Sequence, residues 1–194
     1  EGCPFKSSDR AMPVDPYGIS KHEAELGLKE ISSHTGMEVV IVRPVLVYGP
    51  GVKANFLSML RVLKTGLPLP LGSVNNHRSF VYIANLVDLI VTCIHHPAAA
   101  DEVFMVSDGI DISTPNLLNL LGRGLGKRVL LIPMPVMLLR FFANLVGKKS
   151  VFERLCGTLQ VDINHTKATL GWVPPVNIEV ALKLTAKAFL KGTR

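Results

Sequence analysis

A tyrosine and a lysine near the start of the chain, Tyr17 and Lys21, are the side chains best suited to chemistry. They are four residues apart, so on a helix they share one face. A cation held near a phenol favours the phenolate, and such a tyrosine can exchange a proton with a sugar hydroxyl or ketone near neutral pH. The lysine can also hold ribose hydroxyls of a bound nucleotide. By itself the spacing is common by chance, and an ordinary surface pair fits it as well.

The residues around this pair predict the helix that it needs. Asp15 followed by Pro16 is typical of a helix start, with an N-cap and a proline at the first helical position. We expect a helix over 16–34, ended by Gly36. Met37–Val42 is a short apolar run rich in Val and Ile, which predicts a strand buried on both faces of a parallel sheet.

Helix and strand signals alternate along the rest of the chain, which predicts the α/β class. Helices are expected over 56–64, from 85 to before Pro97, and over 114–121, 136–146, 165–170 and 178–190, with Asn55, Asn85 and Thr114 as caps. Extended segments are expected over 67–72, 79–83, 102–107 and 129–132, and a loop over 43–53. No glycine-rich dinucleotide turn lies between a strand and a helix, since Gly122–Gly126 follows a helix.

Composition indicates a folded domain with a modest positive charge. The 194 residues are 48% hydrophobic and 19% charged, with a formal charge of +6. This excess suits an anionic ligand such as a diphosphate, although a solvated basic surface also explains it. The lysine and arginine residues are scattered along the sequence, so no nucleic-acid partner is expected. Mean hydropathy is +0.34, which fits either a Leu/Val-rich core or surface that packs against a missing part.

The cysteines and the most apolar stretch of the sequence indicate in which compartment the protein lies and whether it crosses a membrane. The three cysteines, Cys3, Cys93 and Cys156, have no metal-ligand spacing, so we expect no metal site and a reducing, cytoplasmic location. Pro133–Val146 is the most apolar stretch, but it is short and contains Arg140, so no membrane span is expected. A core helix is the preferred interpretation there, and contact with a membrane surface is the alternative.

An ordered set of motifs carries a family resemblance. The set is Pro16-Tyr17-Gly18-Ile19-Ser20-Lys21, then Arg43-Pro44-Val45-Leu46-Val47-Tyr48-Gly49, Arg78-Ser79-Phe80-Val81-Tyr82, Asp162-Ile163-Asn164-His165-Thr166-Lys167 and Leu170-Gly171-Trp172. It resembles the extended short-chain dehydrogenases/reductases, specifically the nucleotide-sugar epimerases, dehydratases and 4-keto reductases. The resemblance covers nearly the whole chain.

The resemblance implies a role for each of several residues. It implies that Tyr17 is the catalytic acid/base and that Lys21 binds the nicotinamide ribose, with the cofactor NAD or NADP. The positions implied to lie beside the nicotinamide are Pro44 and Val45. Those implied to contact the nucleotide sugar are Asn55, Phe56, Leu69, Leu71, Arg78 and Arg154, the arginines serving the diphosphate.

The sequence departs from the family pattern in three places. The glycine-rich phosphate loop is absent, and the family's catalytic Ser or Thr would precede Glu1. Leu46 stands where many epimerases have an asparagine, which favours a reductase or dehydrogenase of 4-keto sugars over a strict 4-epimerase. The tail from Leu155 through Trp172 also resembles bacterial enzymes of quinovosamine-type sugar synthesis.

The resemblance implies the end of a Rossmann-type doubly wound parallel sheet plus a small mixed α/β substrate domain. We expect residues 1–52 to close the NAD(P)-binding domain, and 53–194 to form mainly the substrate domain, with a later strand and helix returning to the first sheet. The expected activity is hydride transfer at C4 of a nucleotide-diphosphate sugar, by a homodimer when full length, with this fragment inactive alone. The alternative is a non-catalytic module that binds nucleotide sugars or a protein.

Overall fold

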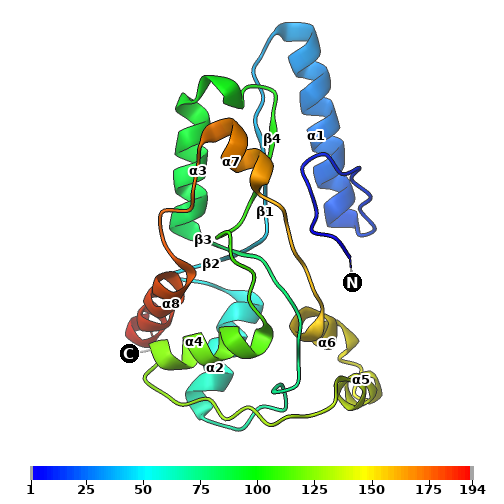
Figure 1. Cartoon of the computed structure of the whole chain (residues 1–194). Helices are drawn as coiled ribbons and strands as arrows, with labels where there is room; N and C mark the ends of the chain where they lie inside the picture. Colours follow the sequence, from blue (N-terminus) through cyan, green and yellow to red (C-terminus); the bar gives the residue numbers. More distant parts are fainter. Residues whose placement is uncertain (1, 193–194) are drawn as a thin grey trace.

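The computed structural model describes residues 2–192 and shows short parallel strands with helices around them (Figure 1). Glu1 and residues 193–194, which belong to the two expected domain ranges, lie outside the described residues. The helices are α1 (Pro16–Thr35), α2 (Ala54–Thr65), α3 (Ile83–His95), α4 (Thr114–Gly124), α5 (Val136–Leu145), α6 (Lys149–Cys156), α7 (Asn164–Leu170) and α8 (Ile178–Gly192), with a 3-10 turn η1 (Pro97–Ala99). The strands are β1 (Ile41–Pro44), β2 (Leu46–Tyr48), β3 (Phe80–Tyr82) and β4 (Val103–Val106).

Helix α1 begins and ends as its sequence predicts. The Asp15 carboxylate accepts a hydrogen bond from the Gly18 amide at 3.0 Å, which satisfies one of the free N–H groups of the first turn. Gly36 ends the helix with a φ of 71°, a left-handed conformation that glycine adopts without strain. In Figure 1 this helix stands on one side of β1, while α3 and α7 lie on the other side.

The strand after α1, β1, begins later than expected and ends at a proline. The next strand, β2, pairs with a different partner. β1 pairs in parallel with β4 only from Ile41, opposite Val103, because β4 offers no partner before that residue. Pro44 has no N–H to donate, and after it β2 pairs in parallel with β3 instead. The expectation of a loop over 43–53 was therefore wrong for residues 43–44, which belong to β1, and for residues 46–48.

The ladder of β2 and β3 separates two hydrophobic cores. Phe80 and Tyr82 point into one core together with Tyr48, against α2, α4 and α8. Val81, between them, points into the other core, which α3 and α7 cover and which contains Phe104. This alternation follows from the two-residue period of a strand. Trp172 is also buried in this second cluster.

A buried carboxylate, Asp108, ties these elements together. It accepts hydrogen bonds from the Tyr48 hydroxyl at 2.7 Å, the Tyr82 amide at 2.8 Å and the Asn85 side chain at 2.7 Å. Asn85 in turn exchanges two hydrogen bonds of 2.9 Å with the backbone of Val176. Burial raises the pKa of Asp108, and the three donors oppose that rise. The network thus joins β2, β3, α3 and the segment before α8.

Three residues expected to cap helices do not occupy the N-cap position. α2 begins after Lys53, so Asn55 lies in its first turn instead of capping it. α3 follows β3 directly, and Asn85 is a buried residue of this helix because its amide serves the Asp108 network. At α4 the cap is Ser113, whose hydroxyl accepts from the Asn116 amide, and Thr114 is the first helical residue.

The apolar segment that was expected to form a core helix does not lie in a core. α5 forms there as expected, but none of its residues is buried. It packs against α6, a helix that the sequence signals did not place, at one end of the molecule (Figure 1). Within residues 2–192, no helix is long and apolar enough to cross a bilayer. The same residues contain no cluster of His, Cys, Asp and Glu that could hold a metal ion.

The Asp108 network gives a first prediction. Asp108→Ala leaves three buried donors without an acceptor, and each costs roughly 1–3 kcal/mol. We expect a loss of about 3 kcal/mol or more in the free energy of unfolding, measured by urea denaturation. Asp108→Asn, which keeps one acceptor oxygen, should lose clearly less. Equal losses for the two variants would show that the hydrogen bonds do not set the stability.

Candidate functional site

A cavity of about 460 Å³ brings together five of the six residues expected to contact substrate. It lies between α2, α4 and α6 and is floored by residues of β2 and β3. The expected residues in its wall are Asn55, Leu69, Leu71, Arg78 and Arg154. The others are Leu46, Ser58, Met59, Val62, Phe80, Thr114, Leu117, Leu118, Val151 and Leu155. Its walls are thus mainly apolar, with two guanidinium groups.

One face of α2 forms a wall of this cavity. Asn55, Ser58, Met59 and Val62 follow the three- and four-residue spacing of a single helical face. Only Asn55 was singled out from the sequence, and this spacing is the signal that would have found the others. Phe56 points the other way: it is 1% exposed and its ring stacks on Tyr48 at 5.4 Å. Its side chain therefore does not line the cavity.

Arg78 is held in place from both sides. Its backbone bridges Ile112 on one side and Leu159 on the other. One terminal nitrogen of its guanidinium donates to the carbonyl oxygens of Arg154 at 2.8 Å and Gly157 at 3.2 Å. Burial lowers the pKa of Arg78, since the charged form loses water. These contacts fix the guanidinium at the cavity wall before a ligand arrives.

The two arginines of the cavity have no acidic partner. Within residues 2–192, no carboxylate forms an ion pair with Arg78 or Arg154. The Arg154 side chain makes only a long contact of 3.4 Å with the Asn55 amide oxygen. A half-buried cation without a counter-charge is costly, and an anionic ligand would remove that cost. The cavity is therefore suited to an anion with an apolar portion.

A residue that the sequence analysis missed positions the α6 wall. Asn76 is buried, and its amide nitrogen donates to Thr114 and to the carbonyl oxygens of Leu155 and Gly157. The Thr114 hydroxyl also donates to the Leu155 carbonyl at 2.6 Å. These bonds join residues between 38 and 81 positions apart in the chain, so no local signal could have indicated them. They hold the end of α6 beside Arg78.

Tyr17 and Lys21 share a face of α1, as their spacing predicts. The Lys21 ammonium lies 5.4 Å from the centre of the Tyr17 ring, and Tyr17 is 72% exposed. Lys21 also lines a small cavity of about 270 Å³ with Gly18 and Arg43. Lys21 therefore lies close to the end of β1, where Pro44 follows Arg43.

An ion pair anchors α1 to β1. The Arg43 Nε donates to Glu25 Oε1 at 2.9 Å, and a second guanidinium nitrogen bonds the other carboxylate oxygen. The hydrogen bond from Arg43 is the main cause that lowers the pKa of Glu25. Further along the helix, the Ser32 hydroxyl donates to Asp101 at 2.7 Å. No residue of α1 is buried, so these polar contacts carry much of its attachment.

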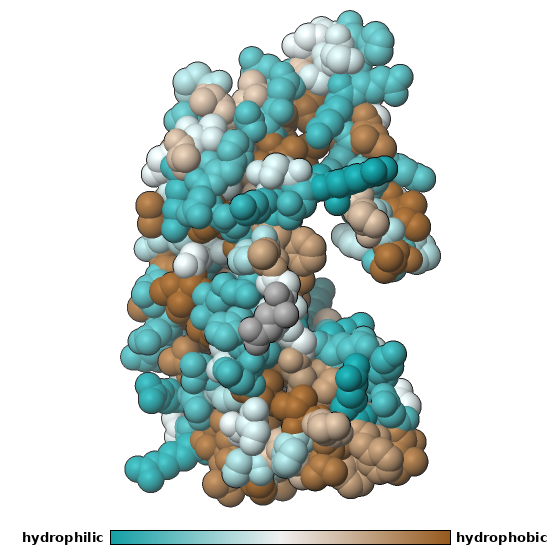
Figure 2. Space-filling view, turned by 45° about the vertical axis from the view of Figure 1, so that its right-hand side comes forward, coloured by the Kyte–Doolittle hydropathy of each residue, from teal (hydrophilic) through white to brown (hydrophobic). Residues whose placement is uncertain are grey.

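The expected cofactor residues lie at the strand end that follows this ion pair. Pro44 ends β1 and is exposed, and Val45 is half-buried against the second core. Figure 2 shows the surface hollowed between the part that carries α1 and the part that carries α5 and α6. The pair of Tyr17 and Lys21 and the arginine cavity thus lie on different parts of the molecule, with this hollow between α1 and α6.

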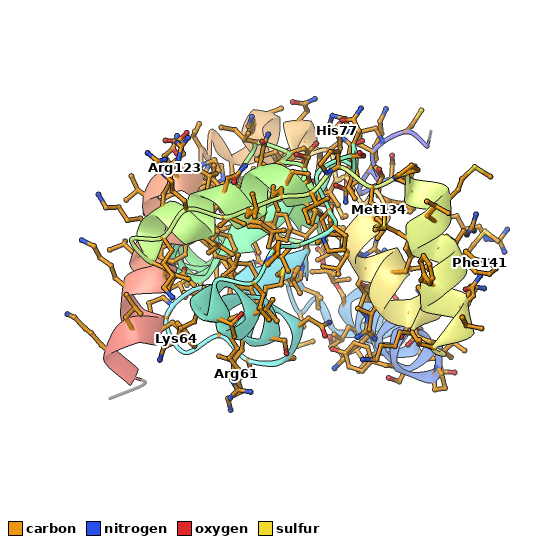
Figure 3. The ribbon with its side chains drawn as sticks, turned by 90° about the horizontal axis from the view of Figure 1, so that it is seen from below. Arg61, Lys64, His77, Arg123, Met134 and Phe141 are labelled. Carbon is orange, nitrogen blue, oxygen red and sulfur yellow. The ribbon has the colours of Figure 1, made fainter. Side chains whose placement is uncertain are left out.

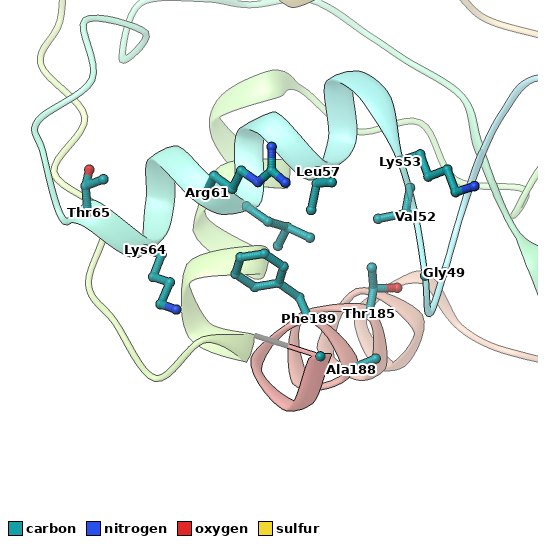
Figure 4. A pocket seen from close by; sticks show the side chains of 13 residues that line it. Gly49, Val52, Lys53, Leu57, Arg61, Lys64, Thr65, Thr185, Ala188 and Phe189 are labelled. Carbon is teal, nitrogen blue, oxygen red and sulfur yellow. The ribbon is translucent and has the colours of Figure 1, made fainter. Parts of the chain in front are cut away.

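A larger hollow of about 810 Å³ lies elsewhere, between α2 and α8 (Figure 4). Lys53, Arg61 and Lys64 surround it, and Leu57 lies at its base. None of the expected site residues lines it. Its charged side chains are surface lysines and an arginine on α2 and its cap, and its buried polar group, the Thr185 hydroxyl, donates to the Ala181 carbonyl within α8. We therefore place the functional site at the smaller cavity and α1.

Comparison with known proteins identifies the family. The model of the NAD dependent epimerase/dehydratase family matches residues 3–107, which is more than half of the chain. The chain belongs to the NAD-dependent epimerase/dehydratase family. The matched stretch includes Tyr17, Lys21 and Arg78, whereas Arg154 lies beyond it.

Individual members of this family are similar over nearly the whole chain. UDP-glucose 4-epimerase of Vibrio cholerae is 53% identical over 192 residues, covering 98% of this chain and 58% of that protein. N-acetyl-alpha-D-glucosaminyl-diphospho-ditrans,octacis-undecaprenol 4-epimerase of Escherichia coli O157:H7 is 26% identical, covering 91% of this chain and 58% of that protein. This chain thus spans 58% of the length of both relatives.

A solved member of the family supports the fold. The crystal structure of UDP-glucuronic acid 4-epimerase from Bacillus cereus, in complex with NAD, has a TM-score of 0.78 and 17% identity. The match covers 100% of this chain and 58% of that chain. The parallel strands and surrounding helices are therefore part of a Rossmann-type epimerase fold, as the sequence predicts.

The ion pair that anchors α1 gives a second prediction. Glu25 has a lowered pKa in the folded state, so its stabilising effect is present above its unfolded pKa of about 4.3 and is lost as the pH falls through the folded pKa. Glu25→Gln should cost about 1–2 kcal/mol of unfolding free energy at pH 7, since hydrogen bonds to a charge are lost. The difference from the wild type should vanish at acid pH.

The matched control is Glu30→Gln, on the same helix but exposed and outside any ion pair in the described part of the chain. It should leave stability unchanged at both pH values. A Glu25→Gln penalty that is the same at pH 7 and at pH 3 would contradict the ionic anchor.

Proposed function

We propose that the complete protein is a nicotinamide-dependent enzyme that transfers hydride at C4 of a sugar carried on a nucleoside diphosphate. The observation that carries this proposal is the cavity with two arginines that lack acidic partners. The names of both relatives support it, since each describes a 4-epimerase whose sugar is carried on a diphosphate. UDP-hexoses are the substrates that we favour.

The diphosphate would bind between Arg78 and Arg154. A guanidinium group presents several N–H donors in a plane, which suits pairs of phosphate oxygens. Arg78 keeps donors for a ligand because the hydrogen bonds to the two carbonyl oxygens involve one terminal nitrogen. Arg154 would turn from Asn55, whose contact of 3.4 Å is weak, toward the second phosphate.

The apolar wall would receive the base. Leu69 and Leu71 lie on an extended segment that bridges Leu131 in parallel, so both side chains are held at the cavity edge. Flat apolar surfaces of this kind cover the face of a pyrimidine ring and exclude water from the diphosphate. Exclusion of water strengthens the arginine contacts. The Asn55 amide would supply a polar contact to the substrate.

Tyr17 would move the proton of the reacting hydroxyl. In the oxidative direction the phenolate of Tyr17 takes the proton from the C4 hydroxyl, and in the reductive direction the phenol returns it to the C4 oxygen. Lys21 stands beside the ring, with its ammonium 5.4 Å from the ring centre. When bound, NAD or NADP supplies the hydride acceptor or donor. Lys21 with Pro44 and Val45 would hold its nicotinamide end, which fits the small cavity that Lys21 lines beside Arg43.

Leu46 favours a reductase of 4-keto sugars beside the 4-epimerase activity. It lines the cavity and offers no polar atom to a sugar hydroxyl. A 4-epimerase must bind its 4-keto intermediate in two orientations, and the lack of a polar contact at Leu46 removes one means of holding them. A reductase binds the 4-keto sugar in one orientation only and needs fewer such contacts.

We further propose that the complete protein is a cytoplasmic homodimer with α1 in its interface. The 194-residue chain alone would bind nucleotide but not turn it over.

The acid/base role gives a third prediction. Tyr17→Phe in the complete protein should lower kcat on UDP-hexoses by about two to four orders of magnitude, since general acid–base catalysis contributes that much. Turnover is measured by the change in nicotinamide absorbance or by conversion of the sugar. Tyr17 is exposed and outside both cores, so the melting temperature should not change. Near-wild-type turnover would refute the assignment.

The diphosphate site gives a fourth prediction. Arg78→Met should weaken UDP binding by about ten- to a hundredfold in calorimetry, since it removes hydrogen bonds between charged groups. Arg78→Lys should recover part of that loss, because it keeps the charge without the fork. The matched control is Arg61→Met, at the larger hollow. If Arg61→Met weakens UDP binding and Arg78→Met does not, the nucleotide binds between α2 and α8 instead.

A further inference from the structure

An apolar helix face on α5 is open to solvent although it is as hydrophobic as a core face. Met137, Phe141 and Leu145 are 84%, 61% and 72% exposed. They are four residues apart, so they form one stripe along the helix. Leu138 and Phe142 widen the stripe, and the rings of Phe141 and Phe142 contact each other edge to face at 5.7 Å. Isolated exposed apolar residues are ordinary, but a contiguous face of large ones indicates a binding surface.

The surface lies at an end of the molecule. Figure 3 shows Phe141 at the outer edge of α5, away from the packed helices, and Figure 2 shows apolar side chains gathered over the same end. The contacts of α5 are with α6, and none of its residues is buried. The stripe is therefore accessible to a flat partner as well as to a protein.

Exposed cations border this face, and Arg140, Lys148 and Lys149 are the ones on α5 or directly after it. Between Asp111 and Glu153 the sequence contains no aspartate or glutamate. Glu153 of α6 forms an exposed ion pair of 3.8 Å with Lys149, so Arg140 and Lys148 are the cations of this group outside any ion pair in the described part of the chain. Arg140 lies on α5 beside the apolar stripe, and Lys148 and Lys149 follow its end. An apolar helix face bordered by lysine and arginine is typical of a helix that lies in the interface of an anionic membrane.

We propose that α5 docks this end of the protein on a bilayer surface that contains anionic phospholipid. The apolar stripe would enter the acyl boundary, and the cations around it would face the lipid phosphates. A second copy fits this surface less well. A two-fold contact centred on Phe141 would place Arg140 of one copy close to Arg140 of the other. The ten residues of α5 are too few to cross the membrane, so the contact is peripheral.

The docked end is adjacent to the proposed substrate site. α6 packs against α5 and contributes Val151, Arg154 and Leu155 to the wall of the arginine cavity. Docking would therefore hold that cavity close to the lipid headgroups. The membrane contact itself rests on α5 alone and does not depend on which substrate the cavity takes.

Vesicle flotation with the complete protein tests the proposal. The probes are vesicles of phosphatidylcholine alone and vesicles that also contain about 30% phosphatidylglycerol, at about 0.15 M salt. We expect the wild type to float with the anionic vesicles only. Phe141→Ser with Leu145→Ser should reduce the floated fraction about tenfold or more, because two large apolar groups no longer enter the bilayer. Lys148→Glu with Lys149→Glu should abolish the preference for phosphatidylglycerol.

The matched control is Val91→Ser with Ile94→Ser, which removes two exposed apolar side chains from α3, away from α5. It should float like the wild type, and UDP binding by all variants should stay unchanged and confirm their folding. Flotation of the Phe141/Leu145 variant at the wild-type level would overturn the proposal. So would light scattering that shows a wild-type dimer which this variant splits, since α5 would then join two copies.

Discussion

One buried carboxylate holds together the strands that floor the arginine cavity. Asp108 accepts hydrogen bonds from Tyr48, Tyr82 and Asn85, and these residues belong to β2, β3 and α3. An unpaired carboxylate in this place would cost several kcal/mol, so the three donors must reach it at the same time. This requirement fixes the β2–β3 ladder between the two cores. Arg78 lies two residues before that ladder.

The cavity combines a rigid floor with walls that come from distant parts of the chain. Arg78 is held by backbone bridges on both sides, whereas the α6 wall depends on the hydrogen bonds of Asn76. Its two arginines lack acidic partners in the described part of the chain, and for the half-buried Arg78 this lack lowers stability, whereas Arg154 is exposed. α1 differs, since it is attached by the pair of Glu25 and Arg43 instead of by a core.

Local signals predicted α1 and the shared face of Tyr17 and Lys21, because capping and helical spacing act over a few residues. Contacts between distant segments were not predictable in this way. The partner change after Pro44 depends on where β3 and β4 lie, so β2 was missed. The sequence likewise cannot say whether an apolar helix is covered, and α5 proved to be exposed. The resemblance singled out Arg78, which lines the cavity, but the hydrogen bonds of Asn76 appear only in three dimensions.

The most direct test of the account follows an isotope. The complete protein is incubated with NAD and a UDP-hexose that carries deuterium at C4, the reaction is quenched with acid at intervals within the first turnover, and the nicotinamide and the sugar are analysed by mass spectrometry. The account predicts one deuterium on the reduced nicotinamide of the quenched wild type, which epimerisation later returns to C4 of the sugar, and no deuterated nicotinamide with Tyr17→Phe over the same times. Deuterium that is lost to water, or a sugar recovered unchanged with no deuterated nicotinamide at any quench time, while the wild-type protein binds UDP at Arg78, would contradict hydride transfer and indicate a module that binds nucleotide sugars without catalysis.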